Sequence, residues 1–433
     1  MTKKLILFLV FIWVIFLAII CFPKETTTSG STSIQRSDDV VVISNPKTPA
    51  HEMRIVFKEE LSIGEFEGDE NYMFGGTIYF ITDDEGNFYV SDSDNNRIQK
   101  YDPEGKYLLT IGREGQGPGE FRDLSVSRLD KDNSLYITDG SNRRISFFDR
   151  NGKYLKQIRM QERHNNLYIN SKGLIIATKS SQSEDDNIMK SIAIYGLFDD
   201  EFNLVKELYK DEIELSRLAG VDESSLAKFL THALSELAFR PFVRYTLANS
   251  DFIYLGYPDK YEINIYSSEG KMVRKITRDY DFLPVSEKDE EYFIEIVSNS
   301  EDFSNPLFTE GLKKKVFQQL KFPKYKPAYQ VLALMENGWL AVIIESIDGE
   351  YTLFDIFDQE GRYIAHFKST DITLPGEGLI AGEGSIYGFQ FFFKNGKAYA
   401  VTEDEGYKFV KRYDIELQEY KGNKWVKSSI KLR

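Results

Sequence analysis

The stretch of the chain with the clearest potential for chemistry is the glycine-rich segment REGQGPGEF, at Arg113–Phe121. Glycine-rich loops often bind phosphate through their backbone amides. Such a loop leads into a helix, however, and in the P-loop it also carries a GK[ST] signature. Here the chain runs into FRDLSVSRLD, at Phe121–Asp130, which has the pattern of a strand. The glycines therefore predict a sharp turn between strands, and we expect no nucleotide there.

Side chains that bind transition metals are few and scattered. The chain has one cysteine, Cys21, which excludes an intrachain disulfide and a zinc site built from cysteines. Four histidines lie far apart and show no HxH or HxxxH spacing: His51, His164, His232 and His366. A calcium site made of oxygen ligands stays open. No GxSxG, HExxH or P-loop motif occurs, so the sequence offers no recognised catalytic motif.

Composition and charge narrow the class of protein. The chain has 433 residues, of which 42% are hydrophobic and 14% aromatic, enough for a large core. Tyrosine (26) and phenylalanine (32) are both abundant, which favours strands over helices. The net charge is −14, and nucleic acids bind to basic surfaces, so we expect no nucleic-acid partner.

The N-terminus carries a targeting or anchoring signal. Two lysines precede the uncharged apolar run Leu5–Phe22, which is about long enough to span a bilayer as a helix. The lysines favour a cytoplasmic N-terminus, which places the rest of the chain outside. The sequence LAIIC resembles a bacterial lipoprotein signal with Cys21 as the lipidated residue, although Ile20 stands where a small residue is usual. Residues 1–22 are therefore predicted to be either a signal peptide or a membrane anchor.

The residues after this signal predict a tether and then one large domain. Residues 23–50 are rich in Ser and Thr and are flanked by prolines, which predicts a flexible linker. Residues 51–425 remain for the folded domain. We expect this domain to be anchored to the membrane through the N-terminus, in the cell envelope, facing the periplasm or the exterior.

An internal repeat defines the fold of that domain. Gly86–Ile111 aligns without gaps with Asn133–Ile158 at a shift of 47 residues, and weaker copies bring the number of repeats to six. Each copy contains short alternating strands separated by turns rich in Asp, Asn and Gly, which is typical of a four-stranded antiparallel meander. Four strands in about 47 residues match the blade of a propeller. The sequence therefore predicts an all-β, six-bladed β-propeller of four-stranded antiparallel blades.

Closure of the ring and two insertions complete the predicted architecture. Glu59–Gly64 aligns with the fourth strand of a blade, while the last copy lacks that strand, so the N-terminal strand is expected to close the ring. Two segments, at about 211–240 and 286–327, show helical spacing and are predicted to be helical insertions. Both join the last strand of one blade to the first of the next, so both are expected on one face.

At this point the sequence resembles the NHL-repeat and TolB-like six-bladed propellers, of a bacterial membrane-tethered, lipoprotein-like type. The resemblance rests on Ile111–Phe121, on Leu135–Leu155 and, for tethered bacterial propellers, on Phe322–Gln330. It implies a binding platform for a protein, peptide or glycan. Some similar propellers are enzymes. Lyases among them hold zinc with several axial histidines, and we expect none in the repeated strands of this chain.

Lactonase-like propellers supply the alternative function, because they hold calcium with Asp, Asn and Glu around the axis. This chain has such residues but no diagnostic spacing, so we expect a monomeric, non-enzymatic binding scaffold without a cofactor. A calcium-assisted lactonase or hydrolase stays open as the alternative.

The predicted binding site lies on the face that carries the insertions, because functional residues gather on the loops of rigid scaffolds. The residues assigned to it are Asn96, Arg113, Arg143, Lys260 and Tyr261. Two further arginines are interpreted as structural. Arg97 and Arg144 each follow an aspartate by five residues across a short loop, which favours a local ion pair.

Overall fold

The computed structural model describes residues 31–37, 39–130, 132, 134–161, 164–185, 188–216, 222–248, 250–300, 303, 308–335, 337–344, 352–369 and 391–428. Cys21 and the apolar run before it lie outside these residues. The described residues belong to one compact unit, Thr32–Arg433. None of the helices in the described ranges is long and apolar enough to cross a membrane.

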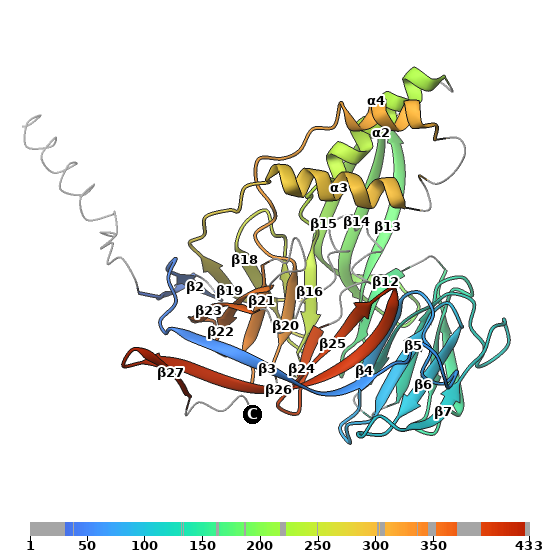
Figure 1. Cartoon of the computed structure of the whole chain (residues 1–433), viewed down its shortest axis with the longest axis horizontal. Coiled ribbons are helices and arrows are strands. Elements are labelled where there is room, and N and C mark those ends of the chain that lie inside the picture. Colours follow the sequence, from blue (N-terminus) through green and yellow to red (C-terminus); the bar gives the residue numbers. More distant parts are fainter. Residues whose placement is uncertain are drawn as a thin grey trace, which may run out of the picture. The chain divides into compact units, whose positions relative to one another are not determined.

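Six antiparallel sheets form the six blades of a propeller, as the repeat predicts (Figure 1). From the first strand outward the blades are β4 (Ile78–Thr82), β5 (Phe88–Asp92), β6 (Arg97–Tyr101), β7 (Tyr107–Ile111); β8 (Leu124–Leu129), β9 (Leu135–Asp139), β10 (Arg144–Phe148), β11 (Tyr154–Arg159); β12 (His164–Ile169), β13 (Ile175–Asp185), β14 (Ile188–Phe198), β15 (Leu204–Ser216); β16 (Arg244–Leu247), β17 (Ile253–Gly256), β18 (Glu262–Tyr266), β19 (Met272–Arg278); β20 (Val331–Leu334), β21 (Leu340–Ile343), β22 (Thr352–Phe357), β23 (Tyr363–Ser369); and β24 (Phe391–Lys394), β25 (Lys397–Asp404), β26 (Tyr407–Lys421). First strands of neighbouring blades pack against one another, β4 against β8 and β20 against both β16 and β24. They are therefore the inner strands of the ring.

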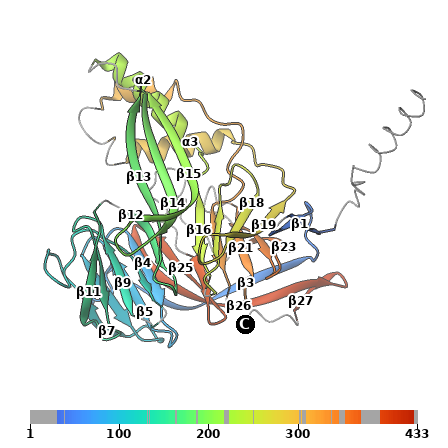
Figure 2. The same cartoon turned by 180° about the vertical axis from the view of Figure 1, so that it is seen from behind.

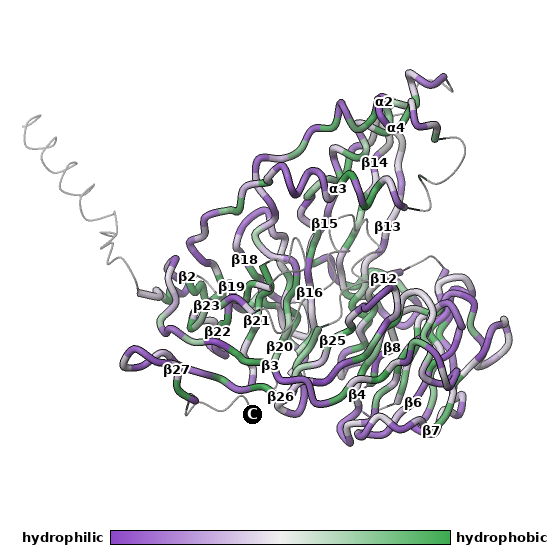
Figure 3. The backbone as a smooth tube through the Cα atoms, viewed as in Figure 1, coloured by the Kyte–Doolittle hydropathy of each residue, from purple (hydrophilic) through white to green (hydrophobic). Residues whose placement is uncertain are grey.

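One turn recurs at the end where the first strand of a blade meets the second and the third meets the fourth. In blade 1, Asp83 Oδ1 accepts hydrogen bonds from the amides of Glu85 (3.0 Å) and Asn87 (2.9 Å). Equivalent bonds to an Asp or Asn carboxyl or amide oxygen occur in other blades, at Asp102, Asp130, Asp149, Asn170, Asp199 and Asp358. These side chains satisfy turn amides and so fix the alternation of strands. Figure 3 shows the resulting pattern of hydrophobic strands and hydrophilic turns.

The N-terminal strand β3 (Met53–Ile63) closes the ring, as predicted. It pairs with β26 in antiparallel register from Ile63 opposite Val410 to Met53 opposite Glu419. β3 thus serves as the outer strand of the sixth blade, and Met53, Ile55 and Phe57 are buried in its core. β27 (Lys424–Lys427) extends the far end of β26 as a hairpin.

Residues 33–45, part of the expected flexible linker, instead form two strands. β1 (Ser33–Ser37) and β2 (Val40–Asn45) make a hairpin, and β2 pairs in parallel with β19, the outer strand of blade 4. Ile43 is 1% exposed. The Asn45 side chain donates to the carbonyl of Gly361 (2.9 Å) and accepts from the Tyr363 amide (2.8 Å), so this hairpin also contacts blade 5.

The helical insertions form a layer above one face of the ring (Figures 1 and 2). The helices are α2 (Glu223–Leu237), α3 (Glu287–Asn299) and α4 (Glu310–Phe317). Ser286 and Asp289 form the capping box that the sequence SEKD suggests at the start of α3. The first insertion differs from the prediction at its start, because residues 211–216 continue strand β15 rather than forming helix.

The strands of blade 3 reach this layer. β13, β14 and β15 stay paired to Asp185, Ile188 and Ser216, well beyond the length of the inner strand β12. The helices bury a separate apolar cluster that includes Ala227, Leu234, Phe239, Phe293, Val297, Leu312 and Val316. The layer therefore has its own core, and blade 3 supports it.

Candidate binding site on the insertion face

The antiparallel order of the strands brings one set of loops to one end of the propeller. These are the loops between the second and third strands of each blade and the connections between blades. The connections that contain α2, α3 and α4 belong to this set. We call this end the insertion face. The opposite end carries the aspartate turns.

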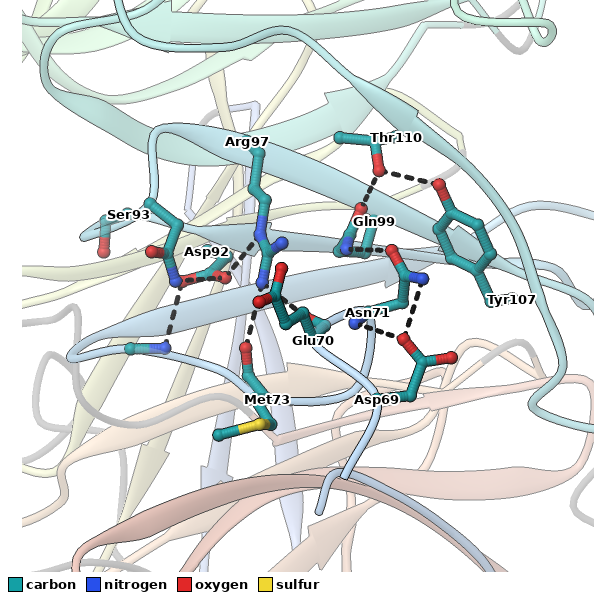
Figure 4. Close-up of polar contacts among 12 residues, drawn as sticks. Asp69, Glu70, Asn71, Met73, Asp92, Ser93, Arg97, Gln99, Tyr107 and Thr110 are labelled. Carbon is teal, nitrogen blue, oxygen red and sulfur yellow. Dashed lines mark hydrogen bonds and ion pairs between the residues drawn. The ribbon is translucent and has the colours of Figure 1, made fainter. Parts of the chain in front are cut away.

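A repeated clamp made of an aspartate and an arginine holds the connections on this face. In blade 1, Arg97 Nε donates to Asp92 Oδ2 at 3.0 Å. Arg97 Nη2 donates to the carbonyls of Glu70 (2.8 Å) and Met73 (2.9 Å), which precede the blade (Figure 4). Asp92 also accepts a bond from the Gly75 amide. The spacing therefore identified a structural ion pair correctly.

The same clamp in blade 2 organises the glycine-rich segment. Arg144 donates to the carbonyls of Gln116 (3.0 Å), Gly117 (2.8 Å) and Glu120 (2.6 Å). Its Nε lies 3.8 Å from Asp139 Oδ2. A loop whose carbonyl oxygens converge on a cation presents the wrong polarity to a phosphate. The Gly117 amide is also occupied, because it donates to Glu120 Oε2 at 2.8 Å. The segment is therefore a blade connection, as expected.

Backbone geometry explains two of the glycines there. Gly119 has a φ of +79°, in the left-handed region that favours glycine. A Cβ on Gly112 would lie 2.0 Å from the ring of Phe121. Phe121 is completely buried, so its ring has no room to move. The glycines thus permit a tight turn over a buried aromatic ring.

Four of the five residues assigned to the binding site from the sequence lie at the surface or near it. Arg113 has a side chain that is 81% exposed, and it pairs with Glu120 at 2.8 Å. Arg143 and Lys260 are exposed, whereas Asn96 is half-buried. Asn96 and Arg143 both adopt a φ of +48° at equivalent loop positions. These residues belong to three different blade connections or loops and no direct contact joins them in the described structure.

Tyr261 differs from that expectation, because its side chain is only 4% exposed. Its hydroxyl donates to Asp355 Oδ2 in the next blade. Burial, together with the Asp355 charge, raises the pKa of Tyr261 well above its usual value. The sequence placed Tyr261 in a polar loop, where an aromatic side chain with a polar end could equally point outward or inward. It supports the loop that carries Lys260 and does not face solvent.

Asp355 collects four donors and thereby joins blades 4 and 5. Besides Tyr261, its carboxylate accepts from Arg278, from the Tyr363 hydroxyl (2.8 Å) and from His366 Nδ1 (2.7 Å). Asp355 is fully buried, and four partners offset the cost of removing its charge from water. This cluster belongs to the frame of the propeller.

Histidines do occur in the repeated strands, contrary to our expectation. His164 begins β12 and His366 lies in β23. His164 is buried against the rings of Phe198 and Phe202, and His366 contacts Asp355. Among the described residues, no group of three or more His, Cys, Asp or Glu side chains is placed to hold a metal ion.

The inner strands have an unexpected charge. In an acidic chain, the six strands contain Arg128, His164, Arg244 and Lys394 but no Asp or Glu. Two of the cations have local partners. Arg128 lies 3.7 Å from the Tyr168 ring centroid and donates to the Leu167 carbonyl. Lys394 donates to the Thr82 carbonyl at 2.7 Å and pairs with Asp84.

Arg244 is the functional candidate that sequence reasoning missed. It is the first residue of β16, so it lies at the insertion-face end of an inner strand. It is partly exposed, but its Nε is buried and has no hydrogen-bond partner. Its register partner is Gly256, which leads into the loop carrying Lys260. The only signal in the sequence was a basic residue on a strand that the repeat places at the axis.

Tyrosines surround this position. Tyr329 donates its hydroxyl to the Glu262 carbonyl at 2.7 Å, and a Cβ on Gly256 would lie 1.8 Å from that hydroxyl. Tyr195 packs against Tyr209 and Tyr245, with ring centroids 6.3 Å and 6.0 Å away. Gly256 therefore allows a tyrosine to approach the backbone beside Arg244.

Comparisons with solved structures find propellers of low sequence identity. A Bacteroides fragilis protein described as exported shares 11% identity over 88% of this chain and 100% of its own, with a TM-score of 0.48. A gluconolactonase from Xanthomonas campestris shares 11% identity over 90% and 99% of the two chains, with a TM-score of 0.37. Virginiamycin B lyase from Staphylococcus aureus shares 9% over 83% and 99%, with a TM-score of 0.39.

Sequence comparison gives the family. No curated protein matches the chain. Residues 69–348 match the model of DUF5128, which is described as a 6-bladed beta-propeller. This match covers most of the chain and spans the first five blades. The chain therefore belongs to the DUF5128 family of six-bladed β-propellers.

Proposed function

We propose that this protein is a membrane-tethered propeller outside the cytoplasm that binds a protein, peptide or glycan on its insertion face. The single observation that carries the proposal is the helical layer. Three helices from two separate connections bury a common apolar cluster above one end of the ring. A ring does not need such a layer for closure, because β3 already closes it.

The contrast between the two faces supports this assignment. The opposite face consists largely of short turns that one aspartate or asparagine side chain organises. The insertion face instead carries varied loops, the helices and the exposed side chains of Arg113, Arg143 and Lys260. Rigid scaffolds usually carry binding residues on variable loops of this kind.

The proposed location rests on the N-terminal sequence. The apolar run Leu5–Phe22 after two lysines is suited to a signal peptide or an anchor, with Cys21 as the lipidated residue in the lipoprotein alternative. The domain then acts as a monomer beside the membrane. No specific observation favours the calcium-assisted hydrolase, since the inner strands contain no carboxylate.

Site-directed photocrosslinking in the native membrane tests the proposal. A photoreactive residue replaces Lys260 or Glu291 on the insertion face, or Glu104 in an aspartate turn on the opposite face. All three positions are exposed. We expect the first two to form the same adduct and Glu104 to form none. Adducts that arise equally from both faces, or from Glu104 alone, would contradict the proposal.

A further inference from the structure

We propose that Arg244 binds a carboxylate group of the ligand at the insertion-face end of the propeller axis. This inference rests on the proposed function and deepens it, because it names the chemistry that the insertion face recognises. It also identifies a residue that the loops and the helical layer surround but do not satisfy.

Other arginines in the fold show what a satisfied guanidinium looks like here. Four that are largely buried each face a carboxylate: Arg97 with Asp92, Arg144 with Asp139, Arg240 with Asp211 and Arg278 with Asp355. Arg244 breaks this pattern, since in the described residues it forms no hydrogen bond and no ion pair. The groups that act on its charge are two tyrosines, Tyr195 and Tyr329.

Leaving this group unpaired costs stability. A polar or charged group that loses water without gaining a partner is unfavourable, and native folds seldom retain one without a reason. Burial lowers the pKa of Arg244 to about 10, which still leaves the guanidinium charged at neutral pH. The nearby Arg240 cannot play the same part, because Asp211 already neutralises it at 2.8 Å. Arg244 is thus a charge in want of an anion.

The number of charges favours a carboxylate over a phosphate. A phosphate group carries between one and two negative charges near neutral pH and usually needs several cationic or amide donors. Here a single guanidinium is unpaired, and its two-pronged geometry matches one carboxylate. The tyrosine rings around it give the rest of the ligand an apolar surface with polar edges.

Two different ligands could supply that carboxylate, an acidic sugar or the C-terminus of a peptide. Calorimetric titration of the full-length protein in detergent can separate them. Glucuronate is compared with neutral glucose, and N-acetylglycine with N-acetylglycinamide. We expect one carboxylate of the two to bind and its neutral counterpart not to bind. Since a charged hydrogen bond contributes about 1.5–3 kcal/mol, Arg244→Gln should weaken that binding about 10- to 100-fold.

Control variants keep the result interpretable. Arg159 is exposed on the outer strand β11, so Arg159→Gln should leave carboxylate binding unchanged. Arg244→Met should leave the melting temperature unchanged or raise it, because no internal partner is lost. The inference is overturned if neither carboxylate binds, if Arg244→Gln binds as well as the wild type, or if Arg244→Met lowers the melting temperature. Each of these results would leave the crosslinking test of the insertion face untouched, so the two failures can be told apart.

Discussion

At the scale of single residues, the clamp arginines decide how the blade connections are held. Arg144 has a side chain that is 6% exposed and directs three donors at carbonyls of one loop. Spacing alone revealed this role, because Arg144 and Asp139 recur as Arg97 and Asp92 one repeat earlier. Spacing could not reveal that Tyr261 points inward or that Arg244 lacks a partner, since both depend on neighbours from other blades.

Replacing Arg144 should be costly. Arg144→Met leaves Asp139 buried without its cation and frees three loop carbonyls, so we expect a loss of about 3 kcal/mol or more in the free energy of unfolding. Arg144→Lys should recover only part of it, because a lysine cannot reproduce the planar set of donors. Urea denaturation measures both. Arg159→Met on the same blade is the control and should stay within about 0.5 kcal/mol of the wild type.

At the scale of elements, local patterns and distant partners explain what the sequence revealed. The 47-residue shift located the strands of the first two blades, because the turn residues that define them are local. The extension of β13 and β14 was missed, since its polar sequence SSQSEDDN lacks apolar alternation. β2 was missed for another reason. Its partner β19 lies more than two hundred residues away, so nothing local marks it as paired.

The N-terminal hairpin supplies a matched pair of residues that tests this added strand. Ile43 in β2 is 1% exposed and packs with the core of blades 4 and 5, whereas Ile34 in β1 is 56% exposed. We expect Ile43→Ala to lower the free energy of unfolding by about 2–4 kcal/mol and Ile34→Ala to change it by less than about 0.5 kcal/mol. Equal small effects in chemical denaturation would show that β2 is not part of the stable domain.

At the scale of the whole molecule, carboxylates are abundant because the fold uses them in its turns and caps. The net charge of −14 is therefore not merely a solubility feature. Several exposed carboxyl groups have a pKa below the ordinary value, and the largest cause is in each case a hydrogen bond. The donors are the Gly117 amide for Glu120, the Asn203 side chain for Asp199 and the Ser225 hydroxyl for Asp222.

These shifts determine how stability depends on pH. A carboxyl group whose pKa is lower in the folded chain than in the unfolded chain binds protons more weakly when folded. Its stabilising contribution is complete above the unfolded pKa of about 4 and is lost as the pH falls through the folded value. We therefore expect the melting temperature to fall steadily below about pH 4. Because hydrogen bonds rather than distant charges are the main cause, the fall should persist in high salt.

Thermal melts between neutral and acidic pH, at low and high salt, measure this dependence. Asp199→Asn removes one of the shifted groups while keeping a side chain that can still accept hydrogen bonds from the turn amides. We expect this variant to show a shallower decline in acid and to lose some stability at neutral pH. A decline that disappears in high salt would assign the effect to general charge repulsion instead. The turns would then contribute little to the acid sensitivity of the propeller, and the carboxylates would matter mainly through net charge.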